Sequence, residues 1–361
     1  MRRNGRLYTL LPSSSGLPLP SWRAQVLSYL VRVVLPVALA LNILLGWTIV
    51  FRTSPPQRGD NSLDDYQALK PELVVTVSPS VVSPPSSRAI VSTLLNDQYT
   101  IPVATLGHSL TTSNATSRRI LMYIAGRLSE ESLCTVRSVG WELHPVLPIA
   151  PPRDGEGINP RFVDVYTKLN LWTLDAIGVE TAVFIDGDTL VRQSFEELFE
   201  LPFVFGAVPD VYEHEGFTTQ INSGVLLARP SSATFNQMMS VLETARFPPS
   251  SGDQAFLDAF FSGEALRLPY VYNANLAIKK RSPELWRRMQ DAVKIVHYTT
   301  PAPFEKAPRE GILGNEDVEK SIKRAKDGSW GEYREEIGWW EEAWRDMERM
   351  NREKLKACKD L

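Results

Sequence analysis

Two carboxylates separated by one glycine are the sharpest chemical feature of the sequence. Asp186-Gly187-Asp188 directly follows the apolar run Thr181–Ile185, which is typical of a buried strand. Ligands of open parallel sheets bind outside the carboxyl ends of the strands, and this pair falls at such an end. Magnesium or manganese is held in proteins by one or two carboxylates together with substrate phosphates. The motif therefore predicts a divalent-cation site, with a polar turn after a strand as the alternative.

His297 is compatible with a metal-binding role or with a structural one. The chain has only four histidines, and this one follows a short apolar run that is typical of a strand. A neutral imidazole suits a borderline metal such as Mn²⁺. The alternative is a structural histidine that only makes hydrogen bonds.

Alternating strand and helix patterns surround these residues. The expected strands are residues 89–95, 118–125, 141–149 and 181–185, and the expected helices are residues 99–110, 129–140 and 162–174. This alternation predicts an α/β fold with a mostly parallel sheet and helices on both faces. A dinucleotide-binding dehydrogenase is excluded because no G-x-G-x-x-G follows the first strand.

The N-terminal region has the pattern of a membrane anchor. Residues 33–51 carry no charge, and at ~1.5 Å per residue they would span about 28 Å, close to the apolar thickness of a bilayer. Residues 1–58 contain seven Arg and no acidic residue, and five of the Arg precede the apolar run. That bias predicts a cytosolic tail at 1–32, one transmembrane helix at 33–51 and a Pro/Ser-rich stem at 52–87. A buried core helix is the alternative for 33–51.

The predicted membrane orientation and the composition indicate a compartment and exclude several classes of function. The predicted topology is that of a single-pass type II protein of the Golgi membrane, with most of the chain in the lumen, where the sequon at Asn114 can be glycosylated. The 361 residues are 43% hydrophobic with a net charge of −3, which argues against wholesale disorder and against a nucleic-acid partner. Cys134 and Cys358 can form at most one bridge, so a disulfide scaffold and a Cys-rich zinc site are excluded.

The C-terminal residues 311–361 are highly charged and contain several tryptophans. Trp340, Trp344, Met347 and Met350 fall on one helical face, which predicts an amphipathic helix packed on the catalytic domain. A helix on a membrane surface is the alternative, and the many Glu residues argue against it.

The sequence resembles the family 8 glycosyltransferases, the glycogenin-like enzymes, in six segments that occur in the same order along the chain. The donor-site block is VYTKLNLWTLDAIGVETAVFIDGDTLVRQSFEELFELP, residues 165–202. The other blocks are residues 92–110, 221–231, 252–261, 268–275 and 296–304. The resemblance implies a GT-A glycosyltransferase domain, which we place at 88–310, and transfer of a hexose or N-acetylhexosamine from a UDP-sugar with retention of configuration. It also implies Mn²⁺ (or Mg²⁺) and a glycan, glycoprotein or glycolipid acceptor.

The resemblance also implies roles for individual residues. The implied metal ligands are Asp186, Asp188 and His297. The implied donor-binding residues are Thr93, Leu95, Asn96 and Tyr99 for the uracil, Lys168 for the phosphates, and Gly187, Asp210, Asn222, Ser223, Gly224 and Asn273 around the sugar. The implied catalytic residues are Lys168, Asp253 and Gln254. Retention without an obvious enzyme nucleophile needs front-face attack, in which the departing phosphate takes the acceptor proton and the Gln254 carbonyl stabilises the anomeric centre.

Three departures from the family pattern bear on function. Ala302 stands where the family has a phosphate-binding lysine, which leaves Lys306 as a substitute, and Ser250 stands where an Asp is common. Lys280 occupies the position of the tyrosine that glycogenin glucosylates, so self-glucosylation is not expected. A non-catalytic lumenal protein that binds nucleotide sugars or glycans remains the alternative function, and a homodimer remains open.

Overall fold

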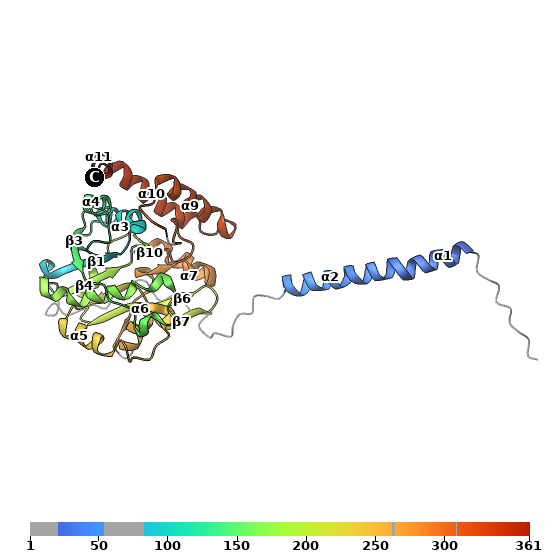
Figure 1. The fold of residues 1–361 in the computed structure, drawn as a ribbon, viewed down its shortest axis with the longest axis horizontal. Coiled ribbons are helices and arrows are strands. Elements are labelled where there is room, and N and C mark those ends of the chain that lie inside the picture. The colour runs from blue at the N-terminus through green and yellow to red at the C-terminus, as the bar shows by residue number, and fades with distance from the viewer. Residues whose placement is uncertain (1–20, 54–82, 262–263, 308) are drawn as a thin grey trace, which may run out of the picture. The chain divides into compact units, whose positions relative to one another are not determined.

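The computed structural model describes residues 21–53, 83–261, 264–307 and 309–361 (Figure 1). The chain divides into two compact units, Met1–Gly59 and Asp60–Leu361. Most of the predicted stem, residues 54–82, lies outside the described residues.

The N-terminal unit is helical where it is described. It consists of α1 (Ser21–Tyr29), a π-helical turn (Leu30–Val34) and α2 (Leu35–Thr53). Pro36 follows the π-helical turn, inside an unbroken run of helical residues, and its missing N–H removes one backbone hydrogen bond from that run. Across the part of the chain that the structure describes, every helix falls short of the combined length and apolarity needed to cross a membrane. The predicted membrane anchor is therefore not confirmed.

A seven-stranded sheet forms the centre of the larger unit, with strand order β3-β2-β1-β4-β7-β6-β8. Its strands are β1 (Arg88–Leu94), β2 (Arg118–Ile124), β3 (Glu142–Val146), β4 (Thr181–Ile185), β6 (Phe205–Tyr212), β7 (Gly216–Ala228) and β8 (Leu266–Arg267). The half β3-β2-β1-β4 is parallel, and β7 runs antiparallel to both β4 and β6. The predicted strands and their mostly parallel arrangement are confirmed, with β7 as the antiparallel exception.

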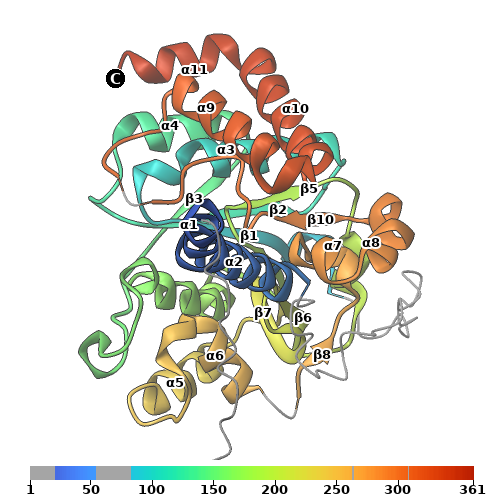
Figure 2. The same cartoon turned by 90° about the vertical axis from the view of Figure 1, so that its right-hand side faces the viewer.

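Helices cover both faces of this sheet, as predicted. Along β1, Ile90 and Leu94 join one apolar cluster while Ala89 and Val91 join the other, because successive side chains point to opposite faces. The helices α3 (Thr100–Thr112), α4 (Glu130–Ser138) and α10 (Arg334–Met350) lie on the first face. The second face is covered by α5 (Ser232–Val241), α6 (Gly252–Phe260) and a 3₁₀ helix (Val165–Ile177), and Figure 2 shows the two layers.

Local sequence explains where several helices begin and end. Ser129 caps α4, since its side chain accepts a hydrogen bond from the Ser132 amide at 3.2 Å. The helix expected at 162–174 is a 3₁₀ helix, and it ends at Gly178, whose φ of 81° is the left-handed conformation that glycine adopts readily. Two shorter helices, α7 (Ala277–Arg281) and α8 (Pro283–Met289), follow the short strand β9 (Ala274–Asn275).

A small second sheet brings distant parts of the chain to the end of β4. It consists of β5 (Thr189–Val191), β10 (Ile295–His297) and β9 (Ala274–Asn275), in the order β5-β10-β9. In the antiparallel register of β10 with β5, His297 lies opposite Thr189. This pairing places His297 next to Asp188, although the two are far apart in sequence.

The C-terminal extension packs on the first face through α9 (Asn315–Asp327), α10 and α11 (Arg352–Lys359). Trp340, Trp344 and Met347 are buried as predicted, but Met350 is 68% exposed, because the buried stripe ends one turn before it. Cys134 and Cys358 form the one bridge that the composition allows, and it joins α4 to α11.

Candidate active site

The turn between β4 and β5 carries the two predicted metal-binding carboxylates. Its backbone is fixed on both sides, since the Asp186 N–H donates to the Gly224 carbonyl at 2.8 Å and the Tyr298 N–H donates to the Asp188 carbonyl at 3.0 Å. The Thr189 hydroxyl also donates to the Asp186 carbonyl at 2.7 Å. Three neighbouring segments therefore hold this turn at the carboxyl end of β4.

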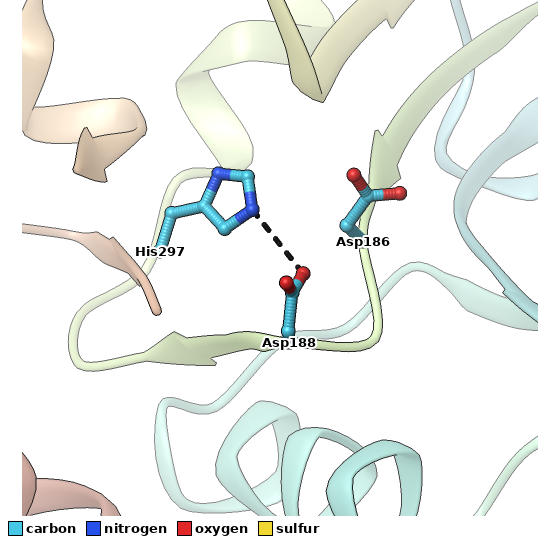
Figure 3. Close-up of side chains that lie close together, drawn as sticks. All are labelled: Asp186, Asp188 and His297. Carbon is cyan, nitrogen blue, oxygen red and sulfur yellow. Dashed lines mark ion pairs between the residues drawn. The ribbon is translucent and has the colours of Figure 1, made fainter. Parts of the chain in front are cut away.

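Asp186, Asp188 and His297 converge on one small space, as Figure 3 shows. Their ligand atoms all lie within 4.8 Å of one another. His297 Nε2 lies 3.2 Å from Asp188 Oδ1. The structure thus brings together the three side chains that the sequence analysis assigned to the metal.

Asn273 fixes the orientation of the His297 ring. The Asn273 amide nitrogen donates to Asn222 Oδ1 at 2.8 Å, so its oxygen is the atom that lies 3.0 Å from His297 Nδ1. Nδ1 then carries the hydrogen, and Nε2 is left to face the carboxylates. Metal-binding histidines are commonly oriented by such a partner on the other ring nitrogen.

Gly224 makes room for the same ring. A Cβ atom at this position would lie 2.2 Å from His297 Cε1 and 2.5 Å from Nδ1, which is far inside contact distance. The residue must therefore be glycine for the ring to occupy its place. Two carboxylates and a fixed imidazole form a donor set that fits Mn²⁺ or Mg²⁺.

Lys168 is the buried cation of the site. Its Nζ lies 3.1 Å from Asp186 Oδ1 and 3.0 Å from Asp253 Oδ2, and it donates to the Ser223 carbonyl at 3.1 Å. Burial disfavours the ammonium, but the charges of Asp186 and Asp253 outweigh burial and raise the pKa of Lys168. The side chain therefore stays charged at neutral pH.

The two carboxylates of the turn differ electrostatically. Burial raises the pKa of Asp186, and this effect exceeds the opposing attraction of Lys168. For Asp188 burial acts in the same direction, but Lys306 and His297 outweigh it and lower the pKa. The Lys306 Nζ contacts Asp188 Oδ2 at 2.5 Å, so the substitute cation considered for the missing family lysine reaches this carboxylate.

A polar network extends from His297 to Gln254 through side chains that the resemblance assigned to the sugar. The Asn222 amide nitrogen donates to Asp210 Oδ1 at 2.9 Å, and the Gln254 amide nitrogen donates to Asp210 Oδ2 at 2.8 Å. The Gln254 carbonyl accepts from the Ser223 N–H at 3.2 Å. Gln254 is therefore held at both ends of its amide, next to the segment that contacts Lys168.

The residues assigned to the uracil lie at the end of β1. A Cβ atom on Gly187 would lie 3.8 Å from both the Thr93 carbonyl and the Tyr99 ring, which places the glycine of the turn beside this segment. The Tyr99 ring meets Phe304 edge-on, with the ring centroids 5.9 Å apart. Leu95 is half-buried and Asn96 is exposed.

The sequence analysis missed Tyr212, whose hydroxyl accepts a hydrogen bond from the Gln254 amide nitrogen at 3.1 Å. Tyr212 lies two residues after Asp210 on β6, and strand residues two apart share a face. The two-residue period of a strand could therefore have identified Tyr212 as a neighbour of Asp210. Lys280, at the position of the family's acceptor tyrosine, forms an ion pair with Glu213.

Comparison with protein families identifies the family of the chain. Glycosyl transferase family 8 matches residues 90–303, which is more than half of the chain. The chain belongs to glycosyl transferase family 8. The matched segment contains every residue assigned above to the metal, the donor or catalysis.

The curated relatives include both glycogenins and a glucuronosyltransferase. Glycogenin of Neurospora crassa is 26% identical over 210 residues, covering 57% of this chain and 30% of that protein. Inositol phosphorylceramide glucuronosyltransferase 1 of Arabidopsis thaliana is 26% identical over 248 residues, covering 62% and 43%. Glycogenin-1 of Oryctolagus cuniculus is 30% identical over 224 residues, covering 59% and 64%. The chain thus spans less than two thirds of the length of each of these relatives.

Solved structures are more distant. The glycosyltransferase GlyE of Streptococcus pneumoniae has a TM-score of 0.47 at 16% identity, covering 72% of this chain and 63% of that chain. The galactosyltransferase LgtC, solved with donor and acceptor sugar analogs, has a TM-score of 0.42 at 18% identity, covering 68% and 99%.

Proposed function

We propose that this family 8 member is a metal-dependent retaining glycosyltransferase that moves a hexose or N-acetylhexosamine from a UDP-sugar to a glycan, glycoprotein or glycolipid. The convergence of Asp186, Asp188 and His297 within 4.8 Å carries the proposal. Two lysines support it, because Lys168 and Lys306 each contact one of the two carboxylates. A diphosphate needs positive charge around it, and this cluster can supply it from two sides.

The metal end of the site stabilises the leaving group. Asp186, Asp188 and His297 would hold the divalent cation, which would supply positive charge to the departing diphosphate. Lys168 and Lys306 lie beside two of these ligands, so both ammonium groups are placed to donate to phosphate oxygens. Burial disfavours the charge on Lys168, but Asp186 and Asp253 raise its pKa, so this donor is an ammonium in the structure.

The other end of the site orients the sugar. Gln254 is fixed by Ser223 and Asp210, which supports the role beside the anomeric carbon that the resemblance implies for it. Asp253 is 5% exposed and paired with Lys168, which favours a positioning role over that of a free nucleophile. This supports front-face attack, in which the departing phosphate oxygen accepts the proton of the acceptor hydroxyl. A covalent glycosyl adduct trapped on Asp253 would contradict that mechanism.

The alternative is a non-catalytic protein that binds nucleotide sugars or glycans. Two departures from the family pattern are the arguments for it: Ala302 in place of a lysine, and Ser250 in place of an Asp. The contact of Lys306 with Asp188 weakens the first argument, because a cation reaches the metal cluster despite Ala302. Ser250 bears only on which sugar is accepted.

We also propose a location in the secretory pathway, with the Golgi membrane as the expected compartment. The disulfide Cys134–Cys358 supports an oxidising compartment. The sequon residue Asn114 is exposed, so it is accessible to glycosylation. The basic N-terminus and the apolar residues 33–51 are the sequence basis for a type II anchor.

UDP release by the purified full-length chain tests the proposal. We expect turnover of at least one of UDP-glucose, UDP-galactose and UDP-N-acetylglucosamine with Mn²⁺, and loss of that turnover with EDTA. Adding back Mn²⁺ should restore the activity. Tight binding of these donors without any UDP release would favour the non-catalytic alternative. Neither binding nor release would contradict the proposed transfer and leave only a glycan-binding protein.

A further inference from the structure

Gln98 holds the backbone on both sides of Lys306. It belongs to the short 3₁₀ helix Asp97–Tyr99 that follows β1, and it is only 3% exposed. Its amide nitrogen donates to the Glu305 carbonyl at 2.7 Å and to the Ala307 carbonyl at 2.8 Å. Because these two residues flank the lysine in the chain, a single buried side chain fixes the loop at the point where the lysine leaves it.

The orientation of the Gln98 amide follows from its partners. The Arg309 N–H donates to the Gln98 side-chain oxygen at 3.3 Å, whereas the carbonyls of Glu305 and Ala307 can only accept. The amide nitrogen must therefore face the two carbonyls, and the oxygen must face the N–H. A side chain of the same length without an amide would release the loop at all three points.

Other contacts of this loop are weaker or lie farther from the lysine. Arg324 of α9 pairs with the Glu305 carboxylate at 2.9 Å, but its side chain is 72% exposed, and ion pairs on the surface contribute little. The buried Phe304 ring packs against aromatic rings of other segments, two residues before Lys306. We therefore expect the contacts of Gln98 to dominate the position of the backbone around Lys306.

That position matters because the Lys306 ammonium reaches the metal cluster. Its Nζ contacts Asp188 and also donates to the Thr299 carbonyl at 3.2 Å, and the side chain is 13% exposed. Under the proposed function this ammonium donates to the diphosphate of the donor. The lysine stem is flexible, so the charge stays at this place only if the backbone that carries it is held.

We propose that Gln98 is a positioning residue for the donor diphosphate, and that it acts through Lys306. Among the described residues, the hydrogen bonds of the Gln98 side chain all go to the loop that carries this lysine. The proposal rests on the proposed function, in which Lys306 contacts the diphosphate. It links the segment assigned to the uracil with the lysine assigned to the phosphates through one buried amide.

A double-mutant cycle on UDP affinity tests this proposal in the full-length chain. Calorimetry with saturating Mn²⁺ gives the Kd of UDP for the wild type, Gln98→Met, Lys306→Ala and the double variant. Methionine keeps the length of the glutamine side chain but makes none of its hydrogen bonds. Lys306→Ala should raise the Kd roughly 10–100-fold, as expected for a lost hydrogen bond to a charged group. Gln98→Met should also raise it, and the double variant should match Lys306→Ala to within about twofold.

Gln193→Met is the matched control. The Gln193 amide also donates to a backbone carbonyl far along the chain, that of Asp291 at 2.6 Å, but it holds a different loop. UDP affinity should therefore stay unchanged in this variant. Hydrogen exchange adds a measurement that needs no ligand, because the Arg309 N–H donates to Gln98. That N–H should exchange faster in Gln98→Met and at the wild-type rate in Gln193→Met.

The outcomes separate this proposal from the proposed function. If the losses in Gln98→Met and Lys306→Ala multiply in the double variant, Gln98 acts on the donor by another route and the proposal is overturned. Unchanged UDP affinity in either single variant, or unchanged exchange of the Arg309 N–H in Gln98→Met, would also overturn it. UDP binding by the wild type without release from any UDP-sugar would contradict the proposed catalysis alone, because the affinities still report on Gln98. No UDP binding by the wild type would contradict both.

Discussion

Two regions of this molecule pair a lysine with a carboxylate, and they differ in how far the carboxylate is buried. In the C-terminal extension, Glu336 is fully buried, and it accepts from Lys279 at 2.7 and 3.0 Å and from the Trp286 indole at 2.9 Å. At the end of β4, the Asp186 and Asp188 side chains keep 27% and 15% of their surface exposed beside Lys168 and Lys306. The first carboxylate is enclosed by fixed partners, whereas the other two face a shared open space.

This difference separates stability from function. A buried carboxylate whose partners are all protein groups contributes to the fold, and removal of one partner leaves an uncompensated charge. Like-charged carboxylates left partly accessible weaken the fold through mutual repulsion, and a divalent cation relieves that repulsion. We therefore expect substitutions at the two regions to have opposite signatures.

Asp188→Asn should have the largest effect, and it should act on catalysis. Loss of a metal-binding carboxylate removes several kcal/mol of leaving-group stabilisation, so UDP release should fall by at least about 1,000-fold. The free energy of unfolding without metal should fall less than in Glu336→Gln, because the repulsion with Asp186 disappears together with the attraction of Lys306 and His297. Steady-state kinetics and urea unfolding measure the two quantities. Asp360→Asn, at an exposed carboxylate near the C-terminus, is the matched control.

Glu336→Gln should show the reverse signature. Removing the carboxylate charge leaves the Lys279 ammonium without its partner, which costs on the order of 3–5 kcal/mol for a buried pair. The Tm should fall markedly in calorimetry, while kcat measured well below the Tm stays within a few-fold. Glu335→Gln, at the exposed neighbour on the same helix, should leave the Tm unchanged. A Tm equal to that of the control would contradict the structural role of Glu336.

Loss of the disulfide should also lower the free energy of unfolding. Cys134→Ser releases a link between α4 and α11 that spans 224 residues of sequence, and such bridges stabilise by about 2–4 kcal/mol. The denaturation midpoint should shift accordingly, with the metal affinity conserved. A large loss of Mn²⁺ affinity at unchanged stability would mean that the extension belongs to the active site.

Two glycine substitutions give the finest comparison of the regions. Gly224→Ala would push a methyl group against His297 and should weaken Mn²⁺ binding about 10–100-fold, the range seen when a ligand's supporting partner is lost. Gly338→Ala, in the interior of α10, has open space and should stabilise the fold by about 0.4–1 kcal/mol. Calorimetric titration with Mn²⁺ and thermal unfolding distinguish the two. Equal Mn²⁺ affinity in both variants would show that the His297 ring can move freely.

The sequence predicted the layers of the fold and the position of the carboxylate pair, because both depend on local pattern. The apolar run Thr181–Ile185 indicates a buried strand, and the carboxyl end of a parallel strand is a ligand-binding position. His297 follows from no local spacing, since the β5–β10 pairing brings it to Asp188; only the family resemblance indicated it.

The position of Lys306 at the metal cluster could not be predicted from local sequence pattern, whereas the burial of Glu336 could. The loop that carries Lys306 is positioned by Gln98, whose amide donates to the carbonyls of Glu305 and Ala307 at 2.7 and 2.8 Å. That contact joins segments about 200 residues apart and has no sequence signature. For Glu336 a signal did exist, because it precedes Trp340 by four residues and so shares the buried face of α10.

Pulsed electron paramagnetic resonance of Mn²⁺ bound with UDP tests the central claim most directly. The full-length chain would carry ¹⁵N-labelled histidine, and the chain has only four histidines. We predict one directly coordinated ¹⁵N, visible as a hyperfine coupling, which is lost in His297→Ala and retained in His214→Ala. A bound Mn²⁺ with no histidine nitrogen, or with a coupling that persists in His297→Ala, would contradict the metal site on which the proposed function depends.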